Sequence, residues 1–152
     1  MYTGVDMGKA ARAIIIEENK ILVMYRNKYG DEYFTLVGGR VAKNESVEQA
    51  LVREVREETG LIVTKGRLVY YEDHPSPYNE QCIFLCEVAP HESIAIQTTS
   101  EEGTLNKLDM NIHKPLWAEI SSFSSLPFRT PQLQNAISKA LRDGFPSEKI
   151  KL

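Results

Sequence analysis

Short apolar runs separated by polar segments predict β-strands in the first third of the chain. Residues 13–16 and 21–25 are rich in isoleucine, valine and leucine, and the polar residues between them predict a hairpin. Residues 33–37 form a third run, and we expect this strand to end at the pair Gly38-Gly39. The pattern therefore favours three strands before any helix.

Two later segments have the period of a helix. The first covers residues 46–59, and Gly60 follows it, at the place where a left-handed glycine commonly ends a helix. The second covers residues 130–142, because Thr130-Pro131 supplies a capping residue followed by proline at the first helical position. Gly144 is expected to end this second helix.

Strand signals occupy the region between the two helices. Residues 61–71 are strand-like but interrupted at 65–67, which predicts either two strands or one strand with a bulge. Residues 82–88 form a strong strand and residues 115–118 a short one, whereas most of 89–114 is polar and irregular. Strands separated by a central helix and followed by another helix predict an α/β fold with a mixed β-sheet between helices.

Composition places the chain among ordinary globular proteins. Its 152 residues are 42% hydrophobic and 26% charged, which is enough for one domain, expected to cover residues 1–152. The formal net charge of -3 argues against binding to a nucleic-acid polymer or to a membrane surface. The longest apolar runs are much shorter than the roughly 18–20 residues of a membrane helix, and the first residues lack the pattern of a secretory signal. We therefore expect a cytoplasmic protein.

The two cysteines are expected to lie in the core. Cys82 and Cys86 fall in the same predicted strand with an even separation, so their side chains point to the same face. No histidine or further cysteine follows at the spacing of a zinc site. A pair of small buried residues is a better interpretation than a disulfide framework or a metal site.

The helix over residues 46–59 carries an unusual arrangement of acids. Its apolar stripe consists of Val47, Ala50, Leu51 and Val55. Glu54, Glu57 and Glu58 are neighbours on one face, and two of them, Glu54 and Glu58, fall inside that stripe. A run of charge on a helix is usually a solvated face, but these carboxylates repel one another, would be costly to bury unpaired, and lie where the helix dipole disfavours negative charge.

This arrangement predicts a positive partner for the three acids. Oxygen ligands without histidine or cysteine favour Mg²⁺ or Mn²⁺ over zinc. Because Mg²⁺ in proteins commonly bridges carboxylates to phosphate oxygens, the implied substrate is phosphorylated.

The same residues resemble the Nudix box. Five residues separate Gly39 from Glu45, seven more separate Glu45 from Arg53, and the segment 53–61 then reads Arg-Glu-Val-Arg-Glu-Glu-Thr-Gly-Leu. The sequence differs from the usual pattern at Val37, where the family commonly has proline, and at Asn44, where it commonly has glycine. Neither change removes a carboxylate, and asparagine tolerates a left-handed backbone.

The resemblance implies an α/β/α sandwich that hydrolyses a nucleoside diphosphate linked to another moiety, with Mg²⁺ or Mn²⁺ bound. It implies that Glu54, Glu57 and Glu58 are metal ligands, that the Gly39 carbonyl completes the metal site, and that Glu54 is one candidate for activating the attacking water. Arg53 would orient the carboxylates and Glu45 would connect the loop to the helix. Glu101 and Glu102 are candidates for a further carboxylate, with Glu102 as the metal ligand.

Weaker signals concern the substrate. Arg12 and Arg26 are candidate phosphate contacts, and Phe34 and Tyr78 are candidates for stacking on a base. Pro75 and Pro77 lie near the position of a proline in ADP-ribose-hydrolysing relatives, whereas a tyrosine near this place is found in dinucleoside polyphosphate hydrolases. The histidines, which are His74, His91 and His113, have no nucleophile pattern and are expected to be structural or solvated.

Several functions stay open at this point. The preferred one is a metal-dependent pyrophosphohydrolase acting on ADP-ribose or a nucleoside diphosphate sugar. Alternatives are a nucleoside triphosphate or dinucleoside polyphosphate pyrophosphohydrolase, a nucleotide-sensing module without turnover, and a domain with a structural cation. The expected partner is a small nucleotide derivative, and analogy with relatives suggests a homodimer.

Overall fold

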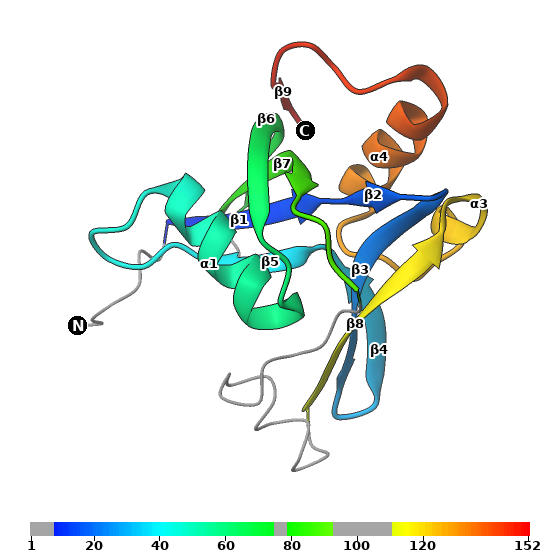
Figure 1. Ribbon diagram of the computed structural model, residues 1–152. Helices are drawn as coiled ribbons and strands as arrows, with labels where there is room; N and C mark the ends of the chain where they lie inside the picture. Colours follow the sequence, from blue (N-terminus) through cyan, green and yellow to red (C-terminus); the bar gives the residue numbers. More distant parts are fainter. Residues whose placement is uncertain (1–7, 75–78, 93–110) are drawn as a thin grey trace.

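A computed structural model describes residues 8–74, 79–92 and 111–152 (Figure 1). In chain order the elements are β1 (Lys9–Ile14), β2 (Ile16–Glu17), β3 (Lys20–Lys28), β4 (Asp31–Thr35), β5 (Val37–Arg40), α1 (Val47–Thr59), β6 (Val63–Asp73), β7 (Glu80–Val88), β8 (Asn111–Glu119), α3 (Ile120–Phe123), α4 (Pro131–Asp143) and β9 (Ile150–Lys151). Within these ranges no helix is both long and apolar enough to span a bilayer.

The strands form two sheets. The larger sheet has the order β5-β1-β7-β6-β9 and is mixed, because β1 runs parallel to β7 but antiparallel to β5. The smaller sheet is antiparallel, with β3 paired to β2, β4 and β8. The α/β fold with a mixed sheet between helices, predicted from the sequence, is confirmed.

Side chains alternate between two core clusters on opposite faces of the larger sheet. Ala11 and Phe84 belong to the cluster under α1, whereas Ile14 and Ile83 belong to the cluster under α4. Figure 1 shows α1 and α4 on the two sides of this sheet. Burying a large apolar side chain contributes about 1.5–3 kcal/mol, so each helix is held mainly by its own cluster.

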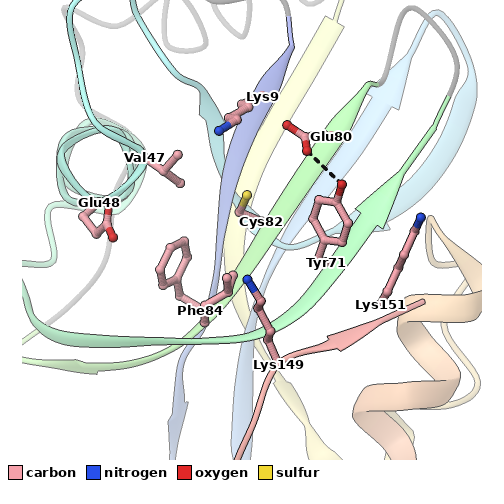
Figure 2. Close-up of a pocket in the computed structure, with 10 residues that line it drawn as sticks. Lys9, Val47, Glu48, Tyr71, Glu80, Cys82, Phe84, Lys149 and Lys151 are labelled. Carbon is pink, nitrogen blue, oxygen red and sulfur yellow. Dashed lines mark hydrogen bonds between the residues drawn. The ribbon is translucent and has the colours of Figure 1, made fainter.

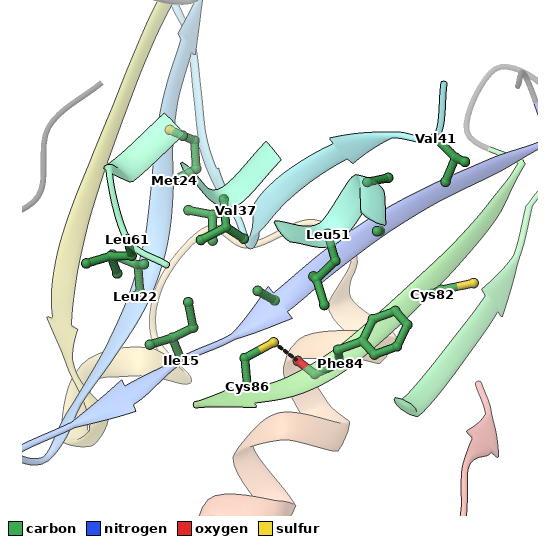
Figure 3. Packing of buried hydrophobic residues seen from close by; sticks show 14 residues of the cluster. Ile15, Leu22, Met24, Val37, Val41, Leu51, Leu61, Cys82, Phe84 and Cys86 are labelled. Atoms are coloured by element: carbon green, nitrogen blue, oxygen red, sulfur yellow. Dashed lines mark hydrogen bonds between the residues drawn. The ribbon is translucent and has the colours of Figure 1, made fainter. Parts of the chain in front are cut away.

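Both cysteines lie in the cluster under α1, as their spacing predicts. Cys82 and Cys86 are free thiols, with exposures of 8% and 7% (Figure 3). The Cys86 thiol donates a weak hydrogen bond to the Phe84 carbonyl oxygen at 3.6 Å. They act as small core residues.

Both long helices begin and end within one residue of the predicted bounds. At the start of α1, the Ser46 hydroxyl accepts the Gln49 N–H and the Gln49 side chain accepts the Ser46 N–H, which completes a capping box. Gly60 ends α1 with a left-handed φ of 80°. The Thr130 hydroxyl caps α4 by accepting the Leu133 N–H, without a reciprocal side-chain bond, and Gly144 follows its last turn.

The prediction that a strand ends at Gly38-Gly39 is wrong. The strand β4 stops at Thr35, and both glycines lie inside a separate strand, β5, which pairs with β1. Gly38 has a φ of 136°, and a Cβ atom there would collide with the Ala11 carbonyl oxygen. Glycine is therefore needed for close strand pairing rather than for a turn.

The interrupted segment after α1 is one strand, β6, and its register shifts at Val63/Lys65 and Leu68/Tyr70 confirm the predicted alternative of a single strand with a bulge. Two other strand boundaries differ from the prediction. The first strand begins at Lys9 rather than at residue 13, and β8 begins at Asn111 rather than at 115. The short elements α3 and β9 carry too few residues to show a period.

Candidate active site

The last turns of α1 lie against the two glycines of β5. The Gly38 backbone N–H donates to Glu58 Oε1 at 2.6 Å, and Glu58 is only 4% exposed. A Cβ atom added to Gly39 would lie 2.5 Å from Glu54 Oε2, so only glycine leaves room for that carboxylate. Glycine in β5 therefore lets a helix face that contains two acids pack directly on backbone.

The three acids on this face differ in exposure. The Glu54 side chain is 15% exposed and the Glu57 side chain 47%, whereas Glu58 is buried. This confirms the expectation that Glu54 and Glu58 point toward the core side of the helix. Within little more than one helical turn, the exposure of these acidic side chains thus ranges from buried at Glu58 to half-exposed at Glu57.

Arg53 connects the acids with the loop before the helix. Its guanidinium donates to both Glu45 oxygens, from Nε at 2.7 Å and from Nη2 at 2.9 Å. Its Nη1 donates to Glu54 Oε1 at 2.8 Å and lies 3.4 Å from Glu57 Oε2. The Glu45 carboxylate also accepts the Ala42 N–H at 2.9 Å. One arginine therefore contacts three carboxylates and fixes the loop to α1.

The pKa values of the pair reflect this contact. The hydrogen bond from Arg53 lowers the pKa of Glu45, and the hydrogen bond to Glu45 raises the pKa of Arg53. Both groups are therefore held in their charged forms.

Arg12 lies at the junction between β1, β5 and β7. Its guanidinium donates to the Gly38 carbonyl oxygen at 3.1 Å and to Gln81 Oε1 at 3.2 Å. Burial lowers the pKa of Arg12, and the nearby positive charge of Arg26 lowers it further. The negative charges of Glu58 and Glu54 act in the opposite direction and raise it. Both arginines named as candidate phosphate contacts therefore lie within electrostatic reach of one another, near the buried acids.

The sequence did not show the partners of Arg26. In the smaller sheet Arg26 is directly opposite Tyr33 on one side and His113 on the other. Its guanidinium carbon lies 5.6 Å from the Tyr33 ring centre, and that of Arg129 lies 3.8 Å from the same centre. Burial, with a contribution from Arg26, lowers the pKa of His113 to about 4. The alternation of β3 predicts the face of Arg26, but only the strand register supplies its neighbours.

The remaining candidates are not brought to the acids by the described structure. Phe34 packs with the cluster under α4, where its ring centre is 5.5 Å from that of Tyr25. Tyr78, Glu101 and Glu102 lie outside the described residues, as do Pro75 and Pro77.

The donor atoms of Glu54, Glu57 and Glu58 are of the type that binds a divalent cation. The three acids offer only oxygen donors, which suit Mg²⁺ and Mn²⁺, and glycine at position 39 opens the space next to Glu54. In the described ranges no three His, Cys, Asp or Glu side chains already form a cluster able to hold a metal. Among the contacts of these acids, Arg53 donates to Glu54 and lies close to Glu57, and the Gly38 N–H donates to Glu58.

The comparisons with known proteins identify the class. A profile described as the NUDIX domain matches residues 7–139, and the chain belongs to this family. The chain is 50% identical to an ADP-ribose pyrophosphatase of Methanocaldococcus jannaschii over 54 residues, which is 35% of this chain and 32% of that protein. It is 42% identical to the CTP pyrophosphohydrolase of Escherichia coli over 65 residues, 41% of this chain and 48% of that one. These matches span a third to about half of those relatives.

A solved structure matches over nearly the whole length. The solution structure of the E. coli ORF135 protein is 25% identical and superposes with a TM-score of 0.65, covering 92% of this chain and 94% of that one. The similarity supports the assignment of the fold.

Proposed function

We propose that the protein is a metal-dependent pyrophosphohydrolase that cleaves the pyrophosphate bond of a nucleoside diphosphate linked to another moiety. The observation that carries this proposal is Glu58, a buried acid on the same helix face as Glu54 and Glu57. Burial of an acid near the C-terminal end of its own helix weakens folding, and a bound cation offsets that cost.

Glu54, Glu57 and Glu58 are the proposed ligands of Mg²⁺ or Mn²⁺, together with the Gly39 carbonyl. When bound, such a cation neutralises phosphate charge and lowers the pKa of a coordinated water. Glu102 is retained as a proposed further ligand, from outside the described residues.

The other residues have proposed positioning roles. Arg53 contacts Glu45, Glu54 and Glu57, so it would keep these carboxylates in fixed positions as substrate binds. Arg12 and Arg26 add positive charge on the β5 side, where a diphosphate would approach. Glu54 is the proposed candidate for accepting the proton of the attacking water.

ADP-ribose or a nucleoside diphosphate sugar is the preferred substrate, and the relative from M. jannaschii is named for this activity. The CTP pyrophosphohydrolase relative supports nucleoside triphosphates as a second candidate. A sensing module without turnover is disfavoured, because such a module has no need of three acids around one helix face.

The test is a hydrolysis panel with purified protein. Release of AMP, phosphate and pyrophosphate is measured for ADP-ribose, nucleoside diphosphate sugars, nucleoside triphosphates and dinucleoside polyphosphates, with Mg²⁺, Mn²⁺ or chelator. We expect turnover with metal only, and a loss of at least about a hundredfold in Glu58→Gln, equivalent to about 2.7 kcal/mol of barrier.

Glu87→Gln is the matched control, because it removes an exposed acid of β7 outside the site. It should keep the wild-type rate. A folded Glu58→Gln protein with the wild-type rate would refute the assignment of Glu58, and metal-dependent melting without product release would favour a structural cation.

A further inference from the structure

A cavity lies beside α1, away from the acids. The helix contacts β5, β1 and β6, and a single helix about 10 Å wide covers only about two strands spaced at about 4.8 Å. The α1-side face of β7 and β6 is therefore only partly covered. The resulting cavity has a volume of about 580 Å³, within the usual range for small-molecule sites (Figure 2).

The cavity does not overlap the candidate active site. Val47 and Glu48, from the first turn of α1, form one wall. Glu58 lies ten residues further along, which is about 15 Å along the helix axis at 1.5 Å per residue. Of the acids in the catalytic proposal that the structure describes, Glu54, Glu57 and Glu58, none lines the cavity.

The floor of the cavity is apolar and aromatic. Cys82 and Phe84 of β7 are buried, and Leu68 and Tyr71 of β6 are half-buried. The Tyr71 hydroxyl donates to Glu80 Oε1 at 2.8 Å, which fixes its ring at the side of the cavity (Figure 2). A planar ring can lie against such a floor and bury its faces.

The rim of the cavity is basic. Lys9 comes from the start of the chain, and Lys149 and Lys151 come from its end, so the fold assembles three ammonium groups that are distant in sequence (Figure 2). Lys151 Nζ lies 5.9 Å from the Tyr71 ring centre. In the part of the chain that the structure describes, no ion pair involves these three lysines.

Acidic and basic side chains of the cavity both act electrostatically on the Cys82 thiol. Burial raises the pKa of the Cys82 thiol most, Glu80 and Glu48 raise it further, and Lys9 and Lys149 lower it. The thiol is thus within electrostatic reach of both sides of the rim. Three lysines against two glutamates leave the lining positive, and one of those glutamates is engaged by Tyr71.

We propose that this cavity binds a small phosphorylated aromatic ligand of the mononucleotide class, with its ring on Phe84 and Tyr71 and its phosphate between the lysines. A phosphate dianion matches several ammonium groups better than a single carboxylate does. This site is separate from the active site and does not depend on the proposed catalytic activity.

The test uses AMP as the probe, with the full-length Glu58→Gln protein in chelator so that the metal-dependent site is disabled. Calorimetry should detect AMP binding, and both adenosine and inorganic phosphate should bind at least about tenfold more weakly, because each supplies only half of the contacts. The variant Lys149→Ala/Lys151→Ala should weaken AMP binding by at least about tenfold. The matched control Lys20→Ala/Lys139→Ala removes two exposed lysines elsewhere and should change it less than about twofold.

Alkylation of Cys82 locates the ligand independently of affinity. Iodoacetamide modification at residues 82 and 86 is followed by peptide mass spectrometry. AMP should slow modification of Cys82 severalfold, and this protection should disappear in Lys149→Ala/Lys151→Ala. Absence of AMP binding, unchanged affinity in the lysine variant, or unchanged Cys82 reactivity at saturating AMP would each overturn the proposal.

Discussion

The helices α1 and α4 are built alike, yet each is associated with a buried acid in a different way. Both have 13 residues, an N-terminal hydroxyl cap and a glycine after the last turn, and they cover opposite faces of one sheet. The buried face of α4 contains Leu133, Ile137 and Ala140, whereas that of α1 continues from Val55 to Glu58.

The acid near α4 is placed where a helix favours it. Glu72, which is 3% exposed, accepts the Thr130 hydroxyl at 2.6 Å at the N-terminus of α4. Glu58 instead lies in the last turns of α1, where the helix dipole opposes its charge. The same folding signals therefore support a favourable position for the acid near α4 and an unfavourable one for the acid in α1, where we propose a bound cation.

The largest expected effects come from one substitution in each helix, one that lowers stability and one that lowers activity. Ile137→Ala should lower the free energy of unfolding by about 2–5 kcal/mol, because it leaves a cavity under α4, with little change in rate for the fraction that stays folded. Glu58→Gln should do the reverse, with at least a hundredfold loss of rate (about 2.7 kcal/mol) and little loss of stability. Denaturant unfolding and the hydrolysis assay measure the two quantities on the same samples. Equal stability losses in both variants would contradict the difference between the helices.

The next prediction concerns the arginine that joins the acids of α1. Lysine cannot reproduce the two hydrogen bonds from Arg53 to Glu45, so Arg53→Lys should cost about 1–2 kcal/mol of unfolding free energy and slow hydrolysis about tenfold. Arg56→Lys, at an exposed position on the same helix, is the control and should change neither quantity. An effect on KM alone, without one on kcat, would count against a role in holding the acids.

Much of this comparison could be predicted from the sequence. The 3.6-residue period and the glycines after the helices predicted α1 and α4, and the Thr130 cap marked the start of α4, because these signals are local. The placement of Glu54 and Glu58 on the core side also followed from helix geometry alone. Cys82 and Cys86 were predicted to share a buried face by strand alternation.

The parts that could not be predicted depend on contacts between distant segments. Gly38 and Gly39 look like a turn in sequence, and only their pairing with β1 shows that they form a strand. The neighbours of Arg26, which are Tyr33 and His113, depend on the register of three strands. Lys9 and Lys149 come together only because the chain end returns to the larger sheet.

A third prediction concerns the pH dependence of stability that comes from His113, a buried histidine opposite Arg26 in the smaller sheet. The pKa of His113 is about 4 in the fold, below its usual value of 6.5, so the unfolded chain binds the proton first as the pH falls. Stability should therefore be complete above about pH 6.5 and decrease as the pH falls toward 4, by about 2 kcal/mol from this group between pH 7 and pH 5.

His113→Gln should lack that share of the decrease between pH 7 and pH 5. Glu45 contributes in a lower window, since its pKa is lowered and its stabilisation is lost only below about pH 4.5. Unfolding curves at closely spaced pH values distinguish the two groups. A wild-type slope in the variant would exclude His113 as its source.

The smallest expected difference lies between the two caps. Ser46→Ala should cost about 1 kcal/mol, because it removes one hydrogen bond to an exposed helix start. Thr130→Ala should cost about 1 kcal/mol more than this, since it also removes the hydrogen bond to buried Glu72. Thr130→Ser keeps the hydroxyl and should recover most of the loss in denaturant unfolding. Equal costs for the two alanine variants would mean that Glu72 is stabilised by the N-terminus of α4 without the Thr130 hydroxyl, and the contrast with Glu58 would then rest on helix polarity alone.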